Sequence, residues 1–251
     1  MGVQPLVEFT KHSEYEDRPR FSVRLEQQPF GQLQVRLAMS YGSRAILSST
    51  DVSSPLSVSP SETALLLLDY QNIAVSRLVD AAPVVLNVAR QMRDWALSKD
   101  MVVYHCLVDT RPGNRPSPRN RMSLKWRMYE DKFASMPALG YEADVLSPID
   151  PGRERMVVRP PGTVSALESA GLLDELGQRG VKSLMLCGLT TSGCVLSTAR
   201  QATDRGFIVT VVEDACFDPV PGLHGILSAH VLPATAHVAI SGELRDAWKV
   251  L

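Results

Sequence analysis

The side chain best suited to covalent chemistry is that of Cys194. An apolar run over residues 183–187 leads through the polar residues 190–193 to this cysteine, where a helical pattern begins. The first backbone N–H groups of a helix carry partial positive charge, which favours a thiolate over a thiol and can stabilise an oxyanion. We therefore predict that Cys194 is the nucleophile of a covalent hydrolase. The alternative is a small buried residue that starts a helix.

Two charged side chains follow other apolar runs. Asp69 comes directly after residues 64–68, and Arg159 directly after residues 156–158. Ligands of open parallel sheets bind beyond the carboxyl ends of the strands, so both side chains are expected near Cys194. A carboxylate in a partly apolar cleft can take a thiol proton, whereas a guanidinium stays charged and only orients or stabilises other groups. A capping aspartate and a surface arginine are the alternatives.

The elements that must position these residues form a regular alternation from residue 63 onward. Continuous apolar runs separated by amphipathic segments indicate a parallel sheet covered on both faces. The predicted strands cover residues 64–68, 101–108, 156–158, 183–187, 207–212 and 236–240. The predicted helices cover residues 81–99, 164–179, 194–205, 221–232 and 243–251. Residues 109–148 have an irregular pattern, with a short helix near 124–133.

The first 60 residues differ from the rest. Residues 21–25 and 32–37 alternate apolar and polar side chains, which indicates a β-hairpin with a turn between them. Residues 48–61 are rich in Ser and Pro, as in a linker. We therefore predict an N-terminal appendage over residues 1–60 and a hydrolase domain over residues 61–251.

The composition is that of a soluble globular protein. The chain has 251 residues, 45% of them hydrophobic, 21% charged, and a net charge of −1. Neither nucleic acid nor an anionic membrane is an expected partner, because the chain carries no net positive charge. The first 20 residues do not resemble a secretory signal, so we expect a cytoplasmic protein. The four cysteines include no C-x-x-C pair and are expected as reduced thiols: Cys106, Cys187, Cys194 and Cys216.

Two segments resemble the isochorismatase-like cysteine hydrolases. Residues 64–72 (ALLLLDYQN) are similar to that family's opening strand with its catalytic Asp, and residues 187–195 (CGLTTSGCV) to its nucleophile segment. The likeness extends over about residues 62–245. It implies a Rossmann-like three-layer α/β/α sandwich with a mainly parallel six-stranded sheet, and an Asp-Lys-Cys triad. It also implies a cis peptide between Leu189 and Thr190, an oxyanion hole from the N–H groups of Thr190 and Cys194, a small-molecule substrate, and a homo-oligomer (dimer or tetramer).

The chain departs from the family pattern at the lysine. Arg159 stands where the family has Lys, and the segment that follows is about two residues longer. Either Arg159 takes over the electrostatic part of the lysine's role, or the activity is altered or lost. A further alternative is that Lys125 or Lys132, from the long segment, substitutes for the family lysine. The Asp-x-His metal set of nicotinamidase relatives is also missing, since His105 falls inside a strand. We expect no metal and no cofactor.

The leading hypothesis is hydrolysis of a C–N bond in a small amide, ureido or carbamoyl compound through a thioester. Vinyl-ether hydrolysis and a catalytically decayed binding paralogue are the alternatives. No G-x-G-x-x-G follows a strand, which disfavours a dinucleotide-binding dehydrogenase. The predicted pocket walls are Gln71, Asn72, Trp126, Tyr129 and Phe133.

Overall fold

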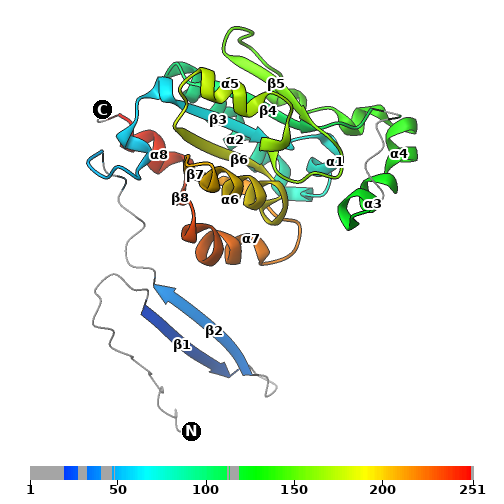
Figure 1. Ribbon diagram of the computed structural model, residues 1–251. Helices are drawn as coiled ribbons and strands as arrows, with labels where there is room; N and C mark the ends of the chain where they lie inside the picture. Colours follow the sequence, from blue (N-terminus) through cyan, green and yellow to red (C-terminus); the bar gives the residue numbers. More distant parts are fainter. Residues whose placement is uncertain are drawn as a thin grey trace, which may run out of the picture. The chain divides into compact units, whose positions relative to one another are not determined.

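The computed structural model describes residues 20–27, 33–40, 47, 49–111, 113 and 119–249, in two compact units that divide between Ile46 and Leu47. In the first unit, β1 (Arg20–Gln27) pairs antiparallel with β2 (Leu33–Ser40) (Figure 1). The turn predicted between these strands lies outside the described residues. The separation of residues 1–60 as an appendage stays a prediction.

A sheet of six parallel strands forms the centre of the second unit (Figure 1). Its strand order is β5-β4-β3-β6-β7-β8. The first strand of this sheet, β3, therefore lies in the middle, and the strand order reverses between β3 and β6. This order confirms the predicted Rossmann-like sandwich. The strands are β3 (Thr63–Leu68), β4 (Val102–Val108), β5 (Glu154–Arg159), β6 (Ser183–Leu189), β7 (Ile208–Phe217) and β8 (His237–Ala239).

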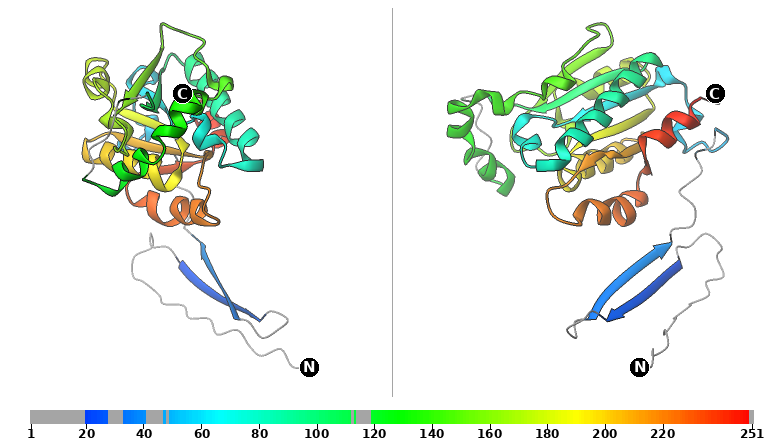
Figure 2. Two further views of the ribbon diagram at one scale, coloured as in Figure 1. Left: turned by 90° about the vertical axis from the view of Figure 1, so that its right-hand side faces the viewer. Right: turned by 180° about the vertical axis from the view of Figure 1, so that it is seen from behind.

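Helices cover both faces of the sheet, as the continuous apolar strands require. Alternate residues of β3 point to opposite faces: Leu65 and Leu67 pack with Met92 of α2, and Leu66 packs with Ala199 of α6. Each fully buried leucine contributes about 1.5–3 kcal/mol of apolar burial. The right-hand view of Figure 2, taken from behind, shows α2 in front of the sheet. The covering helices are α2 (Ala82–Ser98) and α8 (Ser241–Ala247) on one face, and α5 (Leu172–Gln178) and α6 (Leu196–Asp204) on the other.

The remaining helices are short and lie between these elements. No helix within the described residues is long and apolar enough to cross a bilayer. The short α-helices are α1 (Asn72–Val75), α3 (Arg121–Arg127), α4 (Glu130–Ser135) and α7 (Leu223–Ile226). The other helical turns are η1 (Pro55–Ser57), η2 (Pro60–Glu62), η3 (Val79–Ala81), η4 (Pro137–Gly140), η5 (Asp144–Leu146), η6 (Ala166–Glu168), η7 (Thr191–Val195), η8 (Leu227–Val231) and η9 (Leu232–Ala234).

Two segments differ from the sequence-based prediction. The helix expected over 164–179 is interrupted: η6 ends at Glu168, and α5 begins only after Gly171, whose φ of 77° is left-handed. Strand β7 continues five residues beyond the predicted end at 212. Acidic residues interrupt its apolar pattern, but Asp214 accepts hydrogen bonds from the N–H and Oγ of Ser241 at 2.8 and 2.7 Å, which stabilise its carboxylate.

The predicted linker also has more structure than its composition indicated. Residues 49–62 include η1 and η2, and Leu56 is buried in the core of the second unit. Ser54 caps η1 by accepting a hydrogen bond from the N–H of Leu56 at 3.2 Å.

Candidate active site

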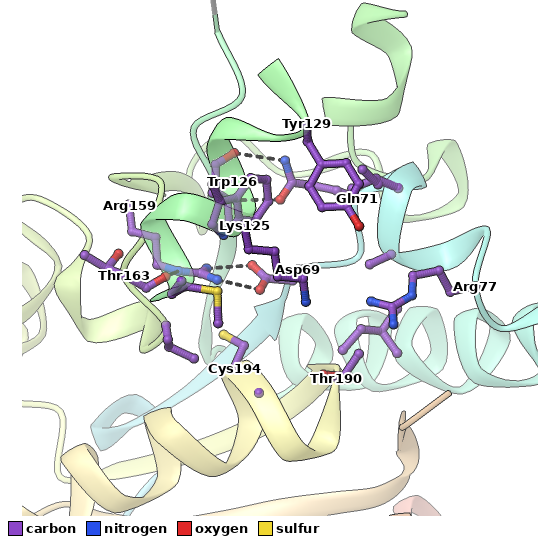
Figure 3. Close-up of a pocket in the computed structure, with 17 residues that line it drawn as sticks. Asp69, Gln71, Arg77, Lys125, Trp126, Tyr129, Arg159, Thr163, Thr190 and Cys194 are labelled. Carbon is purple, nitrogen blue, oxygen red and sulfur yellow. Dashed lines mark hydrogen bonds and ion pairs between the residues drawn. The ribbon is translucent and has the colours of Figure 1, made fainter. Parts of the chain in front are cut away.

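A cavity of about 140 Å³ opens at the carboxyl ends of β3, β5 and β6 (Figure 3). Asp69 follows β3, Arg159 ends β5, and Thr190 and Cys194 follow β6, and all four side chains line this cavity. Two of these strands, β3 and β6, flank the point where the strand order reverses, which is where open α/β sheets bind ligands. The structure therefore brings together the three residues expected to carry the chemistry.

Asp69 and Arg159 form a bidentate ion pair in this cavity. Nη1 and Nη2 of the guanidinium donate to Oδ1 and Oδ2 of the carboxylate, both at 2.6 Å (Figure 3). The Arg159 side chain is 3% exposed and the Asp69 side chain 14%. Asp69 has a φ of 55°, a left-handed conformation that aspartate tolerates better than most residues, and its N–H donates to the carbonyl of Cys106 at 2.9 Å. The chain thus turns sharply at the end of β3, at the cavity.

A turn behind Arg159 fixes the other side of its guanidinium. Nε donates to the carbonyl of Thr163 at 3.3 Å, and the Thr163 hydroxyl donates to the carbonyl of Pro160 at 2.7 Å. This turn lies in the segment that is longer than the family pattern. Burial alone lowers the pKa of Arg159, but the negative charges that Cys194 and Asp69 can carry raise it by more than burial lowers it. The net pKa therefore lies above the ordinary value. Arg159 is therefore a permanent cation that cannot act as an acid.

Cys194 faces the cavity as a neutral thiol. Its residue is 3% exposed, and burial, followed by the nearby Asp69 carboxylate, raises the pKa of its thiol to about 12. The expectation of a stabilised thiolate is wrong for the resting protein, because burial and a neighbouring negative charge favour the neutral thiol. The chain is also kinked at Gly193 (φ −102°, ψ −106°), and α6 begins at Leu196 instead of at the cysteine.

The segment that carries Thr190 and Cys194 is anchored from the neighbouring strand. The N–H of Ser192 donates to Oδ2 of Asp218 at 2.8 Å, and Asp218 is 3% exposed at the end of β7. Asp218 was not predicted as a site residue, although it follows a strand directly, which is the same signal that predicted Asp69. The Leu189–Thr190 peptide is cis, as the family resemblance implied. The assignment of an oxyanion hole to this segment stays a prediction.

The predicted wall residues divide into those that line the cavity and those behind it. Gln71, Trp126 and Tyr129 line it (Figure 3), whereas Asn72 and Phe133 are not among the described residues that do. Asn72 instead donates to the carbonyl of Ala138 at 2.9 Å. Phe133 is buried and stacks on Trp126, with ring centroids 5.7 Å apart. It supports the wall from behind.

Gln71 has a structural contact for each end of its amide. Its Nε2 donates to the carbonyls of Val108 and Gly140 at 2.9 and 2.7 Å, and its Oε1 accepts from the N–H of Val108 at 2.9 Å. Gln71 is 2% exposed. These backbone contacts fix the geometry of the cavity wall.

Two further cations line the same cavity. Lys125 reaches it from α3, and Arg77 follows α1 (Figure 3). Lys125 was a predicted substitute for the family lysine, whereas Arg77 was not predicted as a site residue. Lys132, the other substitute considered, is not among the described residues that line the cavity.

His105 lies apart from this cavity in a buried cluster. Its Nδ1 contacts Glu142 at 2.8 Å and its Nε2 contacts Glu154 at 3.1 Å. Burial lowers the pKa of His105, but the two carboxylates raise it more, so the net pKa is above the ordinary value. Within the described residues, no group of three or more His, Cys, Asp or Glu side chains has the arrangement of a metal site.

Comparison with known proteins identifies a common family. Residues 63–241 match the family model described as Isochorismatase domain. Streptothricin hydrolase of Streptomyces noursei is 28% identical over 72% of this chain and 66% of its own length. Ureidoacrylate amidohydrolase RutB of Acinetobacter baylyi is 22% identical over 66% of this chain and 75% of its own length. The structure of a cysteine hydrolase from Pseudomonas syringae pv. phaseolicola shares the fold, with a TM-score of 0.65 and 16% identity over 77% of this chain and 95% of that one.

Proposed function

The chain belongs to the isochorismatase family, and we propose that it is a cysteine hydrolase that cleaves a C–N bond in a small amide, ureido or carbamoyl compound. The observation that carries this proposal is the convergence of Cys194, Asp69 and Arg159 on one cavity. Relatives named as a hydrolase and an amidohydrolase support the reaction class.

The state of Cys194 determines which step needs assistance. A thiol whose pKa is about 12 is not ionised near neutral pH, so it must lose its proton as it attacks. We assign Asp69, which lines the same cavity, as the acceptor of that proton. Each of its oxygens receives one N–H from Arg159, and each retains a second lone pair. Arg159 therefore orients the base without blocking it.

The proposed reaction has two stages, acylation of Cys194 and hydrolysis of the resulting thioester. Sγ of Cys194 attacks the carbonyl carbon while Asp69 takes the thiol proton, and the N–H groups of Thr190 and Cys194 stabilise the oxyanion. The C–N bond then breaks, and the proton on Asp69 passes to the leaving nitrogen. In the second stage, water attacks the thioester as Asp69 takes a proton from it. The C–S bond breaks, the proton on Asp69 passes to Sγ of Cys194, and a carboxylic or carbamic acid leaves the restored thiol.

The decisive experiment traps the thioester. A panel of small amides, ureido acids and carbamoyl compounds is incubated with the full chain, quenched in acid, and analysed by peptide mass spectrometry. We expect an acyl adduct on Cys194 and product release, and we expect both to disappear in Cys194→Ala and in Asp69→Asn. Hydrolysis of these compounds that persists in Cys194→Ala would refute the thioester mechanism, and hydrolysis of an added vinyl ether by both proteins would support the vinyl-ether alternative. Binding without turnover in the unmodified protein would support a decayed paralogue.

A further inference from the structure

The cavity contains more positive charge than its ion pair requires. Its charged lining residues are one acid, Asp69, and three bases, Arg77, Lys125 and Arg159. Arg159 and Asp69 neutralise each other through two short hydrogen bonds. Among the residues that the structure describes, Arg77 and Lys125 have no acidic side chain in contact. Cys194 is neutral. Two positive charges therefore remain without compensation.

This excess is local. The whole chain has a net charge of −1, so a random portion of its surface carries no excess of cations. Figure 3 shows Arg77 on the side of Asp69 away from Arg159, and Lys125 extending from α3 into the cavity. Apolar and aromatic side chains, including Trp126 and Leu189, line the same cavity beside these charges. A cleft with low-dielectric walls and one sign of charge concentrates ligands of the opposite sign.

The size of the cavity limits the ligand. An apolar cavity of about 150 Å³ holds a molecule the size of benzene, and this one measures about 140 Å³. A planar carboxylate matches the donor fork of an arginine and is attracted to the point charge of a lysine.

We propose that the substrate is a small anion: an amide, ureido or carbamoyl compound that carries a carboxylate remote from the bond that breaks. The carboxylate binds Arg77 and Lys125 while the reacting carbonyl lies at Cys194. This inference rests on the proposed function, because Cys194 defines which end of the substrate reacts. It assigns to Arg77 and Lys125 a role in specificity and none in the covalent steps.

The test compares two alkylating reagents of nearly equal size and different charge. Iodoacetate is an anion and iodoacetamide is neutral, and both form a thioether at Sγ with release of iodide. The full chain is treated with each reagent at pH 8.5, and modification of Cys194 is measured by peptide mass spectrometry. The ratio of the two rates is divided by the ratio for free N-acetylcysteine. Changes in the ionisation of Cys194 cancel in this ratio.

We expect the normalised ratio to favour iodoacetate by about tenfold, since each exposed cation contributes roughly three- to fivefold, as in exposed ion pairs. Arg77→Gln and Lys125→Gln should each lower the normalised ratio roughly three- to fivefold, and the double variant should approach a ratio of one. In the unmodified protein, 0.5 M NaCl should reduce the preference for iodoacetate. Lys132→Gln is the matched control. It removes the same charge from α4, outside the cavity, and should leave the ratio unchanged.

A ratio near one in the unmodified protein, or an equal ratio in Arg77→Gln, Lys125→Gln and Lys132→Gln, would overturn the inference. These outcomes are independent of turnover, because alkylation needs no hydrolysis. A protein that prefers iodoacetate but forms no thioester with any compound would retain the anion site and lose the proposed function. A protein that forms a thioester but has no preference would retain the function and lose the anionic substrate.

Discussion

Replacing Arg159 by Lys tests whether the guanidinium fork holds Asp69 in place. Arg159 donates two hydrogen bonds of 2.6 Å to Asp69 and one of 3.3 Å to Thr163. A lysine amine is a single point on a shorter chain and retains one of these contacts. A hydrogen bond to a charged group contributes about 1.5–3 kcal/mol, so losing one bond to Asp69 and the weaker bond to Thr163 is expected to cost about 3 kcal/mol. For a domain of this size the melting temperature should fall by about 6–12 °C.

Thermal unfolding of the full chain measures the stability, and hydrolysis of the best compound found in the panel measures activity. Because Asp69 would lose one of its two fixed contacts, kcat/KM for Arg159→Lys should fall by at least about tenfold, which corresponds to 1.4 kcal/mol. The control for activity is Arg155→Lys, on the same strand but outside the cavity, which should leave kcat/KM unchanged. An Arg159→Lys protein with unchanged melting temperature and unchanged kcat/KM would refute the assigned role of the fork.

Three further predictions concern other parts of the second unit. The pKa of His105 is raised by Glu142 and Glu154 despite burial, so its stabilisation is complete below the unfolded pKa and is lost as pH rises through the higher folded pKa. In urea titrations the free energy of unfolding should therefore fall as pH rises above about 6.5, and less steeply in His105→Gln. Gly188→Ala should cost about 3 kcal/mol in the same titrations, since a Cβ there would lie 2.4 Å from the Cβ of Leu68, and equal stability would contradict this close approach. Trp126→Ala should raise KM about tenfold with a smaller change in kcat, because it removes an aromatic wall, and an unchanged KM would exclude Trp126 from the binding site.

The central fold could be predicted because burial on both faces leaves a simple sequence pattern. Each residue of β3 is buried, so the run of leucines at 65–68 has no polar interruption. The same reasoning failed for β7, because the charge of Asp214 is stabilised by Ser241, a residue distant in sequence. A hydrogen bond that depends on tertiary structure leaves no trace in the local pattern.

The site was predictable to the extent that it depends on strand ends. Asp69, Arg159 and Cys194 all follow strands of one parallel sheet, so topology alone brings them to one edge. The ionisation of Cys194 was not predictable, because it depends on burial. The position of Arg77 in the cavity could not be predicted, nor could the fact that Trp126 lines the cavity while Phe133 lies behind it. Both depend on the fold of irregular segments, for which the sequence has no periodic signal.

The contacts of Gln71 suggest that the segment between β4 and β5 can be replaced as a unit. The Gln71 side chain hydrogen-bonds to the backbone at Val108, where this segment begins, and at Gly140, where it comes back to the cavity wall. Lys125 and Trp126 lie between these two points, whereas Cys194 and Asp69 lie outside them. Grafting a foreign segment of similar span, with Gln71 retained, should therefore change which compounds the cavity binds while Asp69, Arg159 and Cys194 keep their positions. Diversification within a lineage can follow the same route.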